Sequence, residues 1–395
     1  MLLAGTIVSW LAAVCIADVE NAGFLERRRP TDLRIASYNI NWDSIFPDDD
    51  PKNHSFRSTE QVEAFRRVIA ALNPDIMCLQ EINRSREPRE IADIFDEAVP
   101  LDGGKRWRAA IGYSNVIVSR YPLGMIRSTT VPAGQRAQCM ALVDLPNTRF
   151  FRDIYIINEH FKCCGGEQSE GKRQRQADSL VNWCRDIRTY GGFIDLPAYT
   201  PFVVAGDFNI VGGPGPIDTV VCGDIQDEKT YGADSPPDWD GTCNADLHPR
   251  HNATGSEDFT WRDDTTRFEP GRLDYMIYTD SVMIAVHSFI LNTTVMTPDA
   301  LDAAGLRKTD VVLQPPGQFD HLPLVADFRL IDPNVPDGDV NRDGATDGAD
   351  IDGFADLIVN GSSGDTGRIG RADYNHNGIL DHNDIILFVV DLLAP

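Results

Sequence analysis

The sequence has little positive charge and few long apolar runs. Its 395 residues include 36 lysines and arginines against 60 aspartates and glutamates, which gives a formal net charge of −24. This deficit argues against a protein that binds nucleic acid through bulk positive charge. After residue 17 no apolar stretch is long enough to span a bilayer, so we expect no transmembrane segment. The chain is long enough for one large or two ordinary domains, and its hydrophobic fraction of 42% is ordinary for a folded protein.

The acidic residues gather at the C-terminus, where residues 331–395 hold thirteen aspartates and three arginines. Two twelve-residue segments there have oxygen-bearing side chains at positions 1, 3, 5, 9 and 12 and glycine at position 6. This spacing, followed each time by an apolar helical pattern, predicts loops that bind Ca²⁺. The predicted ligands are Asp339, Asn341, Asp343, Asp347 and Asp350 in the first loop, and Asp373, Asn375, Asn377, Asp381 and Asp384 in the second.

Aspartate at position 12 of both loops, with one helix after each, resembles a type I dockerin over about residues 336–393. The resemblance implies a small all-α calcium-binding domain that docks onto a cohesin-bearing scaffold. We assign residues 337–395 to this dockerin-like domain and residues 331–336 to a linker.

The N-terminus begins with an apolar run, Leu2 to Ala17, which suits the core of a signal peptide although it lacks a basic start. A buried N-terminal helix is the alternative. With residues 1–17 as a signal peptide, the protein is secreted or at the cell surface, and disulfides can form. Cys222 with Cys243 is the first candidate bridge, and Cys184 with Cys163 or Cys164 is the second.

Polar side chains recur where apolar, strand-like runs end in the first 330 residues. The run from Leu33 to Trp42 alternates with period two, which predicts a strand with Asn39 and Asn41 on one face. A helix carrying Val62 to Leu72 follows and ends at Asn73-Pro74. Further runs deliver the same kinds of side chain: Glu81, Asn158 with His160, Asp207 with Asn209, Asp274, and Asp320 with His321.

This inventory predicts metal-assisted hydrolysis of a phosphoester. Carboxylate and amide oxygens suit Mg²⁺, which usually binds a substrate phosphate as well. The two histidines titrate near neutrality, so they can assist the attacking water and the leaving oxygen. Glycosidase chemistry would need neither the histidines nor the amides.

These segments stand in the order seen in the endonuclease/exonuclease/phosphatase superfamily, the DNase I-like proteins, which residues 32–330 resemble. The matching segments are Ser37-Tyr-Asn39-Ile-Asn41, Leu79-Gln80-Glu81, Ser114-Asn115 to Pro122, Asn158-Glu-His160, Gly206-Asp207-Phe-Asn209, Arg272-Leu-Asp274-Tyr and Asp320-His321-Leu-Pro323. The resemblance implies an α/β fold, a four-layer α/β/β/α sandwich with two mixed sheets, whose strand ends meet in one cleft.

The resemblance also implies roles for the site residues. Glu81 would be the main ligand of Mg²⁺ or Mn²⁺, with Asn41 and Asp320 near the metal. Asp207 would orient or deprotonate the attacking water, and Asn209 and Asn39 would hold the phosphate. His321, oriented by Asp274, would act as base or stabilise the phosphorane, and His160 would protonate the leaving oxygen. Base and acid stay interchangeable at this stage, and no carboxylate that orients His160 is identifiable.

The substrate is open among phosphoesters. The candidate substrate-binding residues are Asn115, Arg84 and Arg173. The two arginines each stand in a basic cluster beside a predicted site residue, which favours a nuclease that acts on DNA or RNA. For Arg173 the alternative is the solvated face of an amphipathic helix. A sphingomyelinase-like or small-molecule phosphodiesterase or phosphatase of the same fold is the alternative function. We expect a monomer.

Overall fold

The computed structural model describes residues 22–46, 59–128, 138–264, 266–311, 319–333, 337–341, 343, 345–360, 366–374 and 380–393. The predicted signal peptide, residues 334–336 of the linker, and the predicted calcium ligands Asn375 and Asn377 lie outside the described residues.

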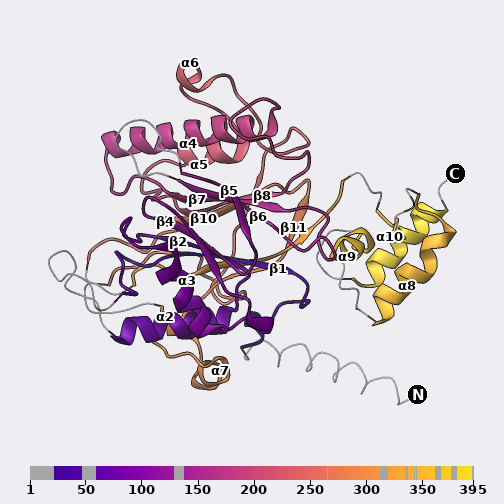
Figure 1. Ribbon diagram of the computed structural model, residues 1–395, viewed down its shortest axis with the longest axis horizontal. Coiled ribbons are helices and arrows are strands. Elements are labelled where there is room, and N and C mark those ends of the chain that lie inside the picture. Colours follow the sequence, from indigo (N-terminus) through magenta and orange to yellow (C-terminus); the bar gives the residue numbers. More distant parts are fainter. Residues whose placement is uncertain are drawn as a thin grey trace, which may run out of the picture.

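Two six-stranded sheets form the centre of the molecule (Figure 1). In the first sheet only β1 and β2 run parallel, so this sheet is mixed. Its strands, in spatial order, are β11 (Met283–Ile290), β12 (Leu324–Leu330), β1 (Leu33–Asn39), β2 (Ile76–Gln80), β4 (Asn115–Ser119) and β3 (Arg108–Gly112).

The second sheet is mixed in the same way, because only β7 and β8 run parallel. Its strands, in spatial order, are β5 (Leu123–Arg127), β6 (Cys139–Val143), β7 (Ile154–His160), β8 (Phe202–Asp207), β10 (Asp274–Tyr278) and β9 (Ala245–Asp246). One apolar core joins residues of both sheets, including Ile35 and Val118 from the first and Ile156 and Val203 from the second.

Helices cover the outer faces of both sheets, which confirms the predicted layering (Figure 1). The first sheet is covered by α2 (Thr59–Leu72) and α3 (Pro88–Ala98), and the second by α4 (Glu167–Arg188) and α5 (Gly215–Cys222). Short helices are α6 (Glu228–Tyr231) and α7 (Pro298–Ala304), and the 3₁₀ turns are η2 (Ala22–Leu25), η3 (Asp102–Gly104), η4 (Thr293–Val295) and η5 (Gly348–Asp350). All seven residues of β1 are buried, because the strand lies between a helical layer on one face and the second sheet on the other.

The strand predicted to reach Trp42 ends earlier. Asn39 is the last residue of β1, and Asn41, Trp42 and Asp43 have φ angles of 50°, 51° and 59°. These left-handed angles break the two-residue alternation, so the predicted shared face of Asn39 and Asn41 is wrong. The turn nevertheless keeps the two residues together, because the backbone N–H of Asn41 donates to Oδ1 of Asn39 at 3.0 Å.

The strand register brings the predicted site residues to one edge of the sandwich. Asn39 pairs with Gln80, so Glu81 follows directly beside the end of β1. In the second sheet, Asp207 pairs with His160 on one side and with Asp274 on the other. Two parallel strand pairs therefore end where an antiparallel strand begins, and this geometry concentrates their polar side chains.

The described C-terminal residues form three helices, α8 (Ile351–Asn360), α9 (Thr366–Ala372) and α10 (His382–Leu392), around a core of their own that includes Phe354, Leu357 and Phe388. They lie to one side of the sandwich, with α9 nearest to it (Figure 1). Arg329 of β12 joins the two parts, since its buried guanidinium lies 2.8 Å from Asp32 and 3.3 Å from Asp373.

The cysteines divide into bridged and reduced groups. Cys222 and Cys243 form a disulfide, as predicted. Cys184 is a buried thiol, so its predicted bridge to Cys163 or Cys164 is wrong: the residue faces the core between α4 and the second sheet. Within the described part of the chain, no helix combines the length and hydrophobicity needed to cross a bilayer.

Candidate active site

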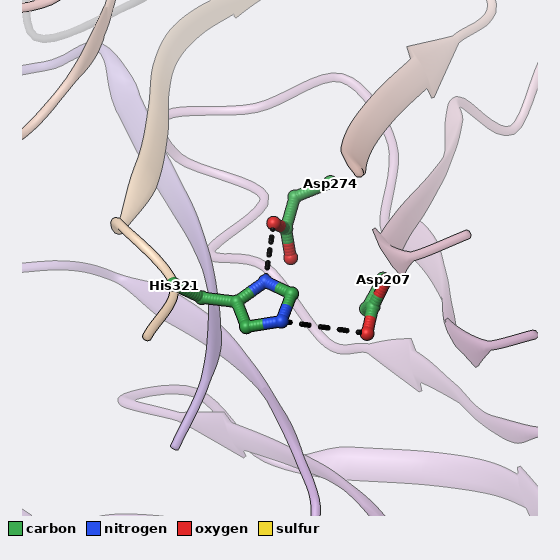
Figure 2. Close-up of side chains that lie close together, drawn as sticks. All are labelled: Asp207, Asp274 and His321. Carbon is green, nitrogen blue, oxygen red and sulfur yellow. Dashed lines mark hydrogen bonds and ion pairs between the residues drawn. The ribbon is translucent and has the colours of Figure 1, made fainter. Parts of the chain in front are cut away.

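A buried histidine–aspartate pair forms the centre of the strand-end cluster (Figure 2). Nδ1 of His321, just before β12, donates to Oδ2 of Asp274 at 2.7 Å, and the facing Nε2 lies 3.7 Å from Oδ2 of Asp207. Asp274 is fixed in turn, because its backbone N–H donates to Oγ1 of Thr260 at 2.8 Å. The pair therefore presents one imidazole nitrogen toward Asp207.

The surroundings of His321 favour its charged form. Burial lowers the pKa of the imidazole, but the negative charges of Asp274, Asp207 and Asp320 and the hydrogen bond to Asp274 raise it more, so the net pKa lies well above the ordinary value. An imidazolium donates hydrogen bonds from both nitrogens, so His321 is suited to stabilise negative charge on a phosphoryl group.

Asp207 accepts hydrogen bonds from two amides. Oδ2 accepts from Nδ2 of Asn209 at 2.8 Å and from Nδ2 of Asn39 at 3.1 Å, while Oδ1 accepts from the backbone N–H of Asn209 at 2.9 Å. Burial raises the pKa of Asp207 to about 7, and the charges of Asp274 and Glu81 add to this while His321 opposes it. A carboxylate with this pKa can accept a proton from water near neutral pH.

His160, at the end of β7, lies between two carboxylates. Its Nε2 is 3.4 Å from Oδ2 of Asp207 and 3.7 Å from Oε1 of Glu81. The structure thus identifies the acidic neighbours of His160 that sequence reasoning could not. The residue is 2% exposed, so its ring is held within the cluster rather than in solvent.

Glu81 has a constrained backbone. Its φ of 66° lies in the left-handed region, which is costly for a residue with a Cβ and is found mainly at functional sites. Two contacts hold it there: Asp43 donates its N–H to the Glu81 carbonyl at 2.8 Å, and Trp42 donates its N–H to Oε2 at 2.9 Å. The left-handed turn at residues 41–43 therefore positions the Glu81 carboxylate.

A cavity of about 790 Å³ opens over this cluster, and its lining fits a hard divalent cation. Glu81, Asp320 and Asp207 line it, together with Asn41. Oxygen donors of this kind suit Mg²⁺, and carboxylates that raise one another's pKa gain stability when a cation lies between them. Among the described residues, Asp207, Asp274 and His321 also bring three potential ligand atoms within 4.8 Å of one another. Because His321 and Asp274 already hydrogen-bond each other, the oxygen donors that line the cavity are a better fit for the cation than this second cluster.

Three predicted substrate-binding residues do not line the cavity. Asn115 is fully buried and its Nδ2 donates to the Asn158 carbonyl at 3.4 Å. Arg84 is exposed, with its guanidinium 5.7 Å from the Tyr113 ring centre.

The prediction that Arg173 binds substrate is wrong. It is 1% exposed, and its Nη1 donates to the carbonyls of Lys162 and Cys164 at 2.9 Å each. A guanidinium buried against backbone carbonyls cannot reach a substrate phosphate, and it is not on a solvated helix face either. Arg173 instead fixes the loop between β7 and α4.

Sequence reasoning missed the aromatic part of the cavity. Trp42, Trp261 and Phe268 line it, and Nε1 of Trp261 donates to Oδ2 of Asp320 at 3.0 Å. Trp261 and Phe268 belong to the irregular segment between β9 and β10, where no periodicity marks a residue for the site. Only tertiary structure brings them to the strand ends.

The described residues of the first predicted calcium loop hydrogen-bond to one another. Oδ1 of Asp350 accepts from the N–H of Asn341 at 2.8 Å, and Oδ1 of Asp339 accepts from the N–H of Asp343 at 3.1 Å. Asp347 and Asp350 also form a capping box at η5, as Asp381 and Asp384 do at α10. Asp373 contacts Arg329 as described above. Calcium binding therefore stays a prediction.

A protein-family model matches most of the part of the chain that forms the sandwich. Residues 36–294 match the model of the Endonuclease/Exonuclease/phosphatase family, which is more than half of the chain. Asp320 and His321 lie beyond the matched residues, and the pairing of β12 with β1 brings them to the same site. No curated protein matches the chain.

Several solved structures are similar in fold. An endonuclease/exonuclease/phosphatase from Bacteroides vulgatus is 16% identical, covering 76% of this chain and 99% of its own, with a TM-score of 0.47. ANGEL2, a 2′,3′-cyclic phosphatase in complex with adenosine-2′,3′-vanadate, is 14% identical, with coverages of 76% and 96% and a TM-score of 0.49. TDP2 of D. rerio, complexed with a single-strand DNA product, is 15% identical, with coverages of 75% and 98% and a TM-score of 0.45.

Proposed function

The chain belongs to the endonuclease/exonuclease/phosphatase family and is a metal-dependent phosphoric ester hydrolase, and from this premise we propose that it is a nuclease that cleaves phosphodiester bonds of DNA or RNA. The observation that carries the nuclease proposal is the aromatic lining of the catalytic cavity. The side chains of Trp42 and Phe268 are 47% and 65% exposed. Exposed aromatic rings beside a phosphate site provide surfaces on which nucleobases stack.

In this proposal each side chain of the cluster has its own role in hydrolysis. Asp207, whose pKa is about 7, takes a proton from the attacking water. Asn39 and Asn209, expected to hold the phosphate, both donate to Asp207, so we assign them the positioning of that carboxylate. The His321 imidazolium stabilises charge on the phosphoryl oxygens, and His160 protonates the leaving oxygen.

The metal in this proposal is Mg²⁺ or Mn²⁺, held by Glu81, Asn41 and Asp320. When bound, such a cation supplies Lewis-acid polarisation of the phosphoryl group. The left-handed backbone at Glu81 and the indole N–H on Asp320 orient these two carboxylates before any ligand arrives.

A panel of substrates tests the proposal. The full chain is incubated with plasmid, single-stranded DNA, RNA, sphingomyelin vesicles and inositol phosphates, in Mg²⁺ or in EDTA, beside His321→Ala. We expect cleavage of nucleic acid that EDTA and the substitution both suppress. Sphingomyelin or inositol phosphate turnover without nucleic-acid cleavage would favour the alternative substrate class.

For the whole chain we propose export and attachment. The Cys222–Cys243 disulfide supports an oxidising compartment, and residues 1–17 would direct the chain there. The repeated spacing in residues 337–395 supports two Ca²⁺ sites, and exposed apolar residues of α10, among them Ile386, Val389 and Val390, support docking to a cohesin-bearing scaffold. Calorimetry of the full chain with Asp343→Ala as control tests calcium binding, and absence of Ca²⁺ uptake by the wild type would contradict it.

A further inference from the structure

Two adjacent cysteines lie at the edge of the catalytic cavity. Cys163 and Cys164 both line it, three and four residues after His160. Both are thiols in the structure, and their Sγ atoms are 2.9 Å apart. Cys164 is exposed, so reagents in solution can reach the pair.

The charge beside the pair favours reaction at Cys163. Nζ of Lys162 donates to Sγ of Cys163 at 3.2 Å. A nearby ammonium stabilises the thiolate, and the thiolate is the nucleophile of thiol–disulfide exchange. The other three described thiols, Cys78, Cys139 and Cys184, are buried, and burial raises the pKa of each, so they stay protonated and shielded.

The backbone on both sides of Cys163 is clamped. The N–H of Lys162 donates to the buried Gln176 at 2.8 Å, and Arg173 holds the carbonyls of Lys162 and Cys164. Cys164 itself has a φ of 75°. The loop is thus held in a conformation that presents both sulfurs to the cavity.

A bridge between neighbours would be strained here. Adjacent Cα atoms lie about 3.8 Å apart across a trans peptide, whereas disulfides usually need about 4.4–6.8 Å. Closing the ring must therefore twist the backbone at Cys163 and Cys164 against the Arg173 clamp. A strained, exposed disulfide is easily reduced again, which is the property of a regulatory rather than a structural bridge.

We infer that Cys163 and Cys164 are a redox-modification site at the catalytic cavity, which small disulfides oxidise to a reversible vicinal disulfide that lowers activity. The thiolate of Cys163 attacks a disulfide R–S–S–R, whose S–S bond breaks, and RS⁻ leaves and takes up a proton. Cys164 then loses its proton and attacks Sγ of Cys163, which releases the second RSH. The two electrons end on the two RSH molecules.

The loss of activity rests on the proposed function, whereas the chemical modification does not. The twisted loop follows directly on His160 and forms part of the cavity wall, so ring closure displaces groups that must fit the substrate. Groups that are displaced from their catalytic positions orient the substrate less well, which slows the reaction. We therefore expect kcat/KM to fall about tenfold.

The experiment treats the full chain with oxidised glutathione, followed by peptide mapping and by phosphodiesterase assay. Wild type should lose two hydrogens in the peptide that holds Cys163 and Cys164, lose activity about tenfold and recover it on mild reduction. The activity of the double variant Cys163→Ser/Cys164→Ser, measured against its own untreated sample, should not respond to oxidised glutathione. Cys163→Ser alone should stop at a mixed glutathione disulfide on Cys164.

Phenylarsine oxide gives an independent measurement, because one arsenic atom bonds two neighbouring thiols. We expect it to bind the wild type at one site and not to bind Cys163→Ser. Unreacted thiols, or persistent mixed disulfides on the wild type, would overturn the modification site. An equal loss of activity in wild type and double variant would overturn the regulation. A mapped vicinal disulfide in an enzyme that cleaves no phosphodiester would support the site and contradict the proposed function.

Discussion

Replacing Asp274 by Asn tests the role of the buried pair at the centre of the site. The substitution keeps the shape of the side chain and removes its charge, 2.7 Å from Nδ1 of His321. A hydrogen bond between charged groups contributes about 1.5–3 kcal/mol. If the charged pair acts in the transition state, its loss lowers kcat about ten- to a hundredfold, since each 1.36 kcal/mol is about a factor of ten.

The raised pKa of His321 also predicts the direction in which the pH profile of the variant shifts. The His321 pKa is raised in the folded enzyme, and Asp274 is the largest of the causes that raise it. Asp274→Asn lowers that pKa, so the imidazolium is lost at lower pH. The alkaline limb of the kcat/KM profile should therefore move to lower pH. A raised folded-state pKa also stabilises the fold fully below about 6.5, the ordinary histidine value, and this contribution is lost as pH rises through the raised value. The variant should lose the part of this contribution that Asp274 supplies, while Asp207 and Asp320 still raise the His321 pKa.

Steady-state hydrolysis of a short oligonucleotide across pH, with thermal unfolding of each sample, provides the assay. Asp153→Asn is the matched control, because Asp153 precedes β7 at the end opposite to His160 and accepts the Leu145 N–H. The control should keep its pH profile. An unshifted alkaline limb in a folded Asp274→Asn enzyme would refute the assignment of His321 as the charged group.

Three further substitutions test separate parts of the structure. Glu81→Gln removes the main proposed metal ligand and should lower Mg²⁺-dependent kcat by about a hundredfold or more while weakening Mn²⁺ binding in calorimetry; unchanged Mn²⁺ affinity would contradict this. Arg173→Met should lower the free energy of unfolding by about 1–3 kcal/mol, since two carbonyls lose their donor. The salt dependence of substrate binding should stay unchanged. A changed salt dependence would mean that Arg173 does contact a substrate phosphate. Arg329→Met removes the buried guanidinium that contacts Asp32 and Asp373, so the melting temperature should fall and proteolysis between residues 331 and 337 should speed up. Equal proteolysis rates would mean that this ion pair does not hold the C-terminal helices.

The clustering of the candidate site residues was predictable because they follow buried strands. An apolar run that ends in Glu81, His160 or Asp207 is visible in the sequence, and parallel neighbours bring such ends to one edge. The conformation that follows a strand is less visible: nothing in Asn41-Trp42-Asp43 marks the left-handed turn that ends β1 and positions Glu81.

Contacts made by long-range packing were not predictable. Trp261 reaches Asp320 from an irregular segment, and Thr260 anchors Asp274 through its hydroxyl. Arg173 was assigned to substrate because it stands in a basic cluster after His160, and the sequence does not show that the loop after β7 folds over the first turns of α4. Charge alone therefore suggested a phosphate contact where backbone carbonyls are the partners.

Hydrolysis of a single-stranded oligonucleotide in isotopically labelled water, with the full chain in Mg²⁺ or EDTA and beside Glu81→Gln, tests the central claim most directly. The account predicts that wild type cleaves in Mg²⁺, that the product phosphate carries one labelled oxygen from water, and that EDTA or Glu81→Gln abolishes the label. Equal incorporation of the label in EDTA and in Glu81→Gln would contradict a metal-dependent phosphodiester hydrolase acting through these residues.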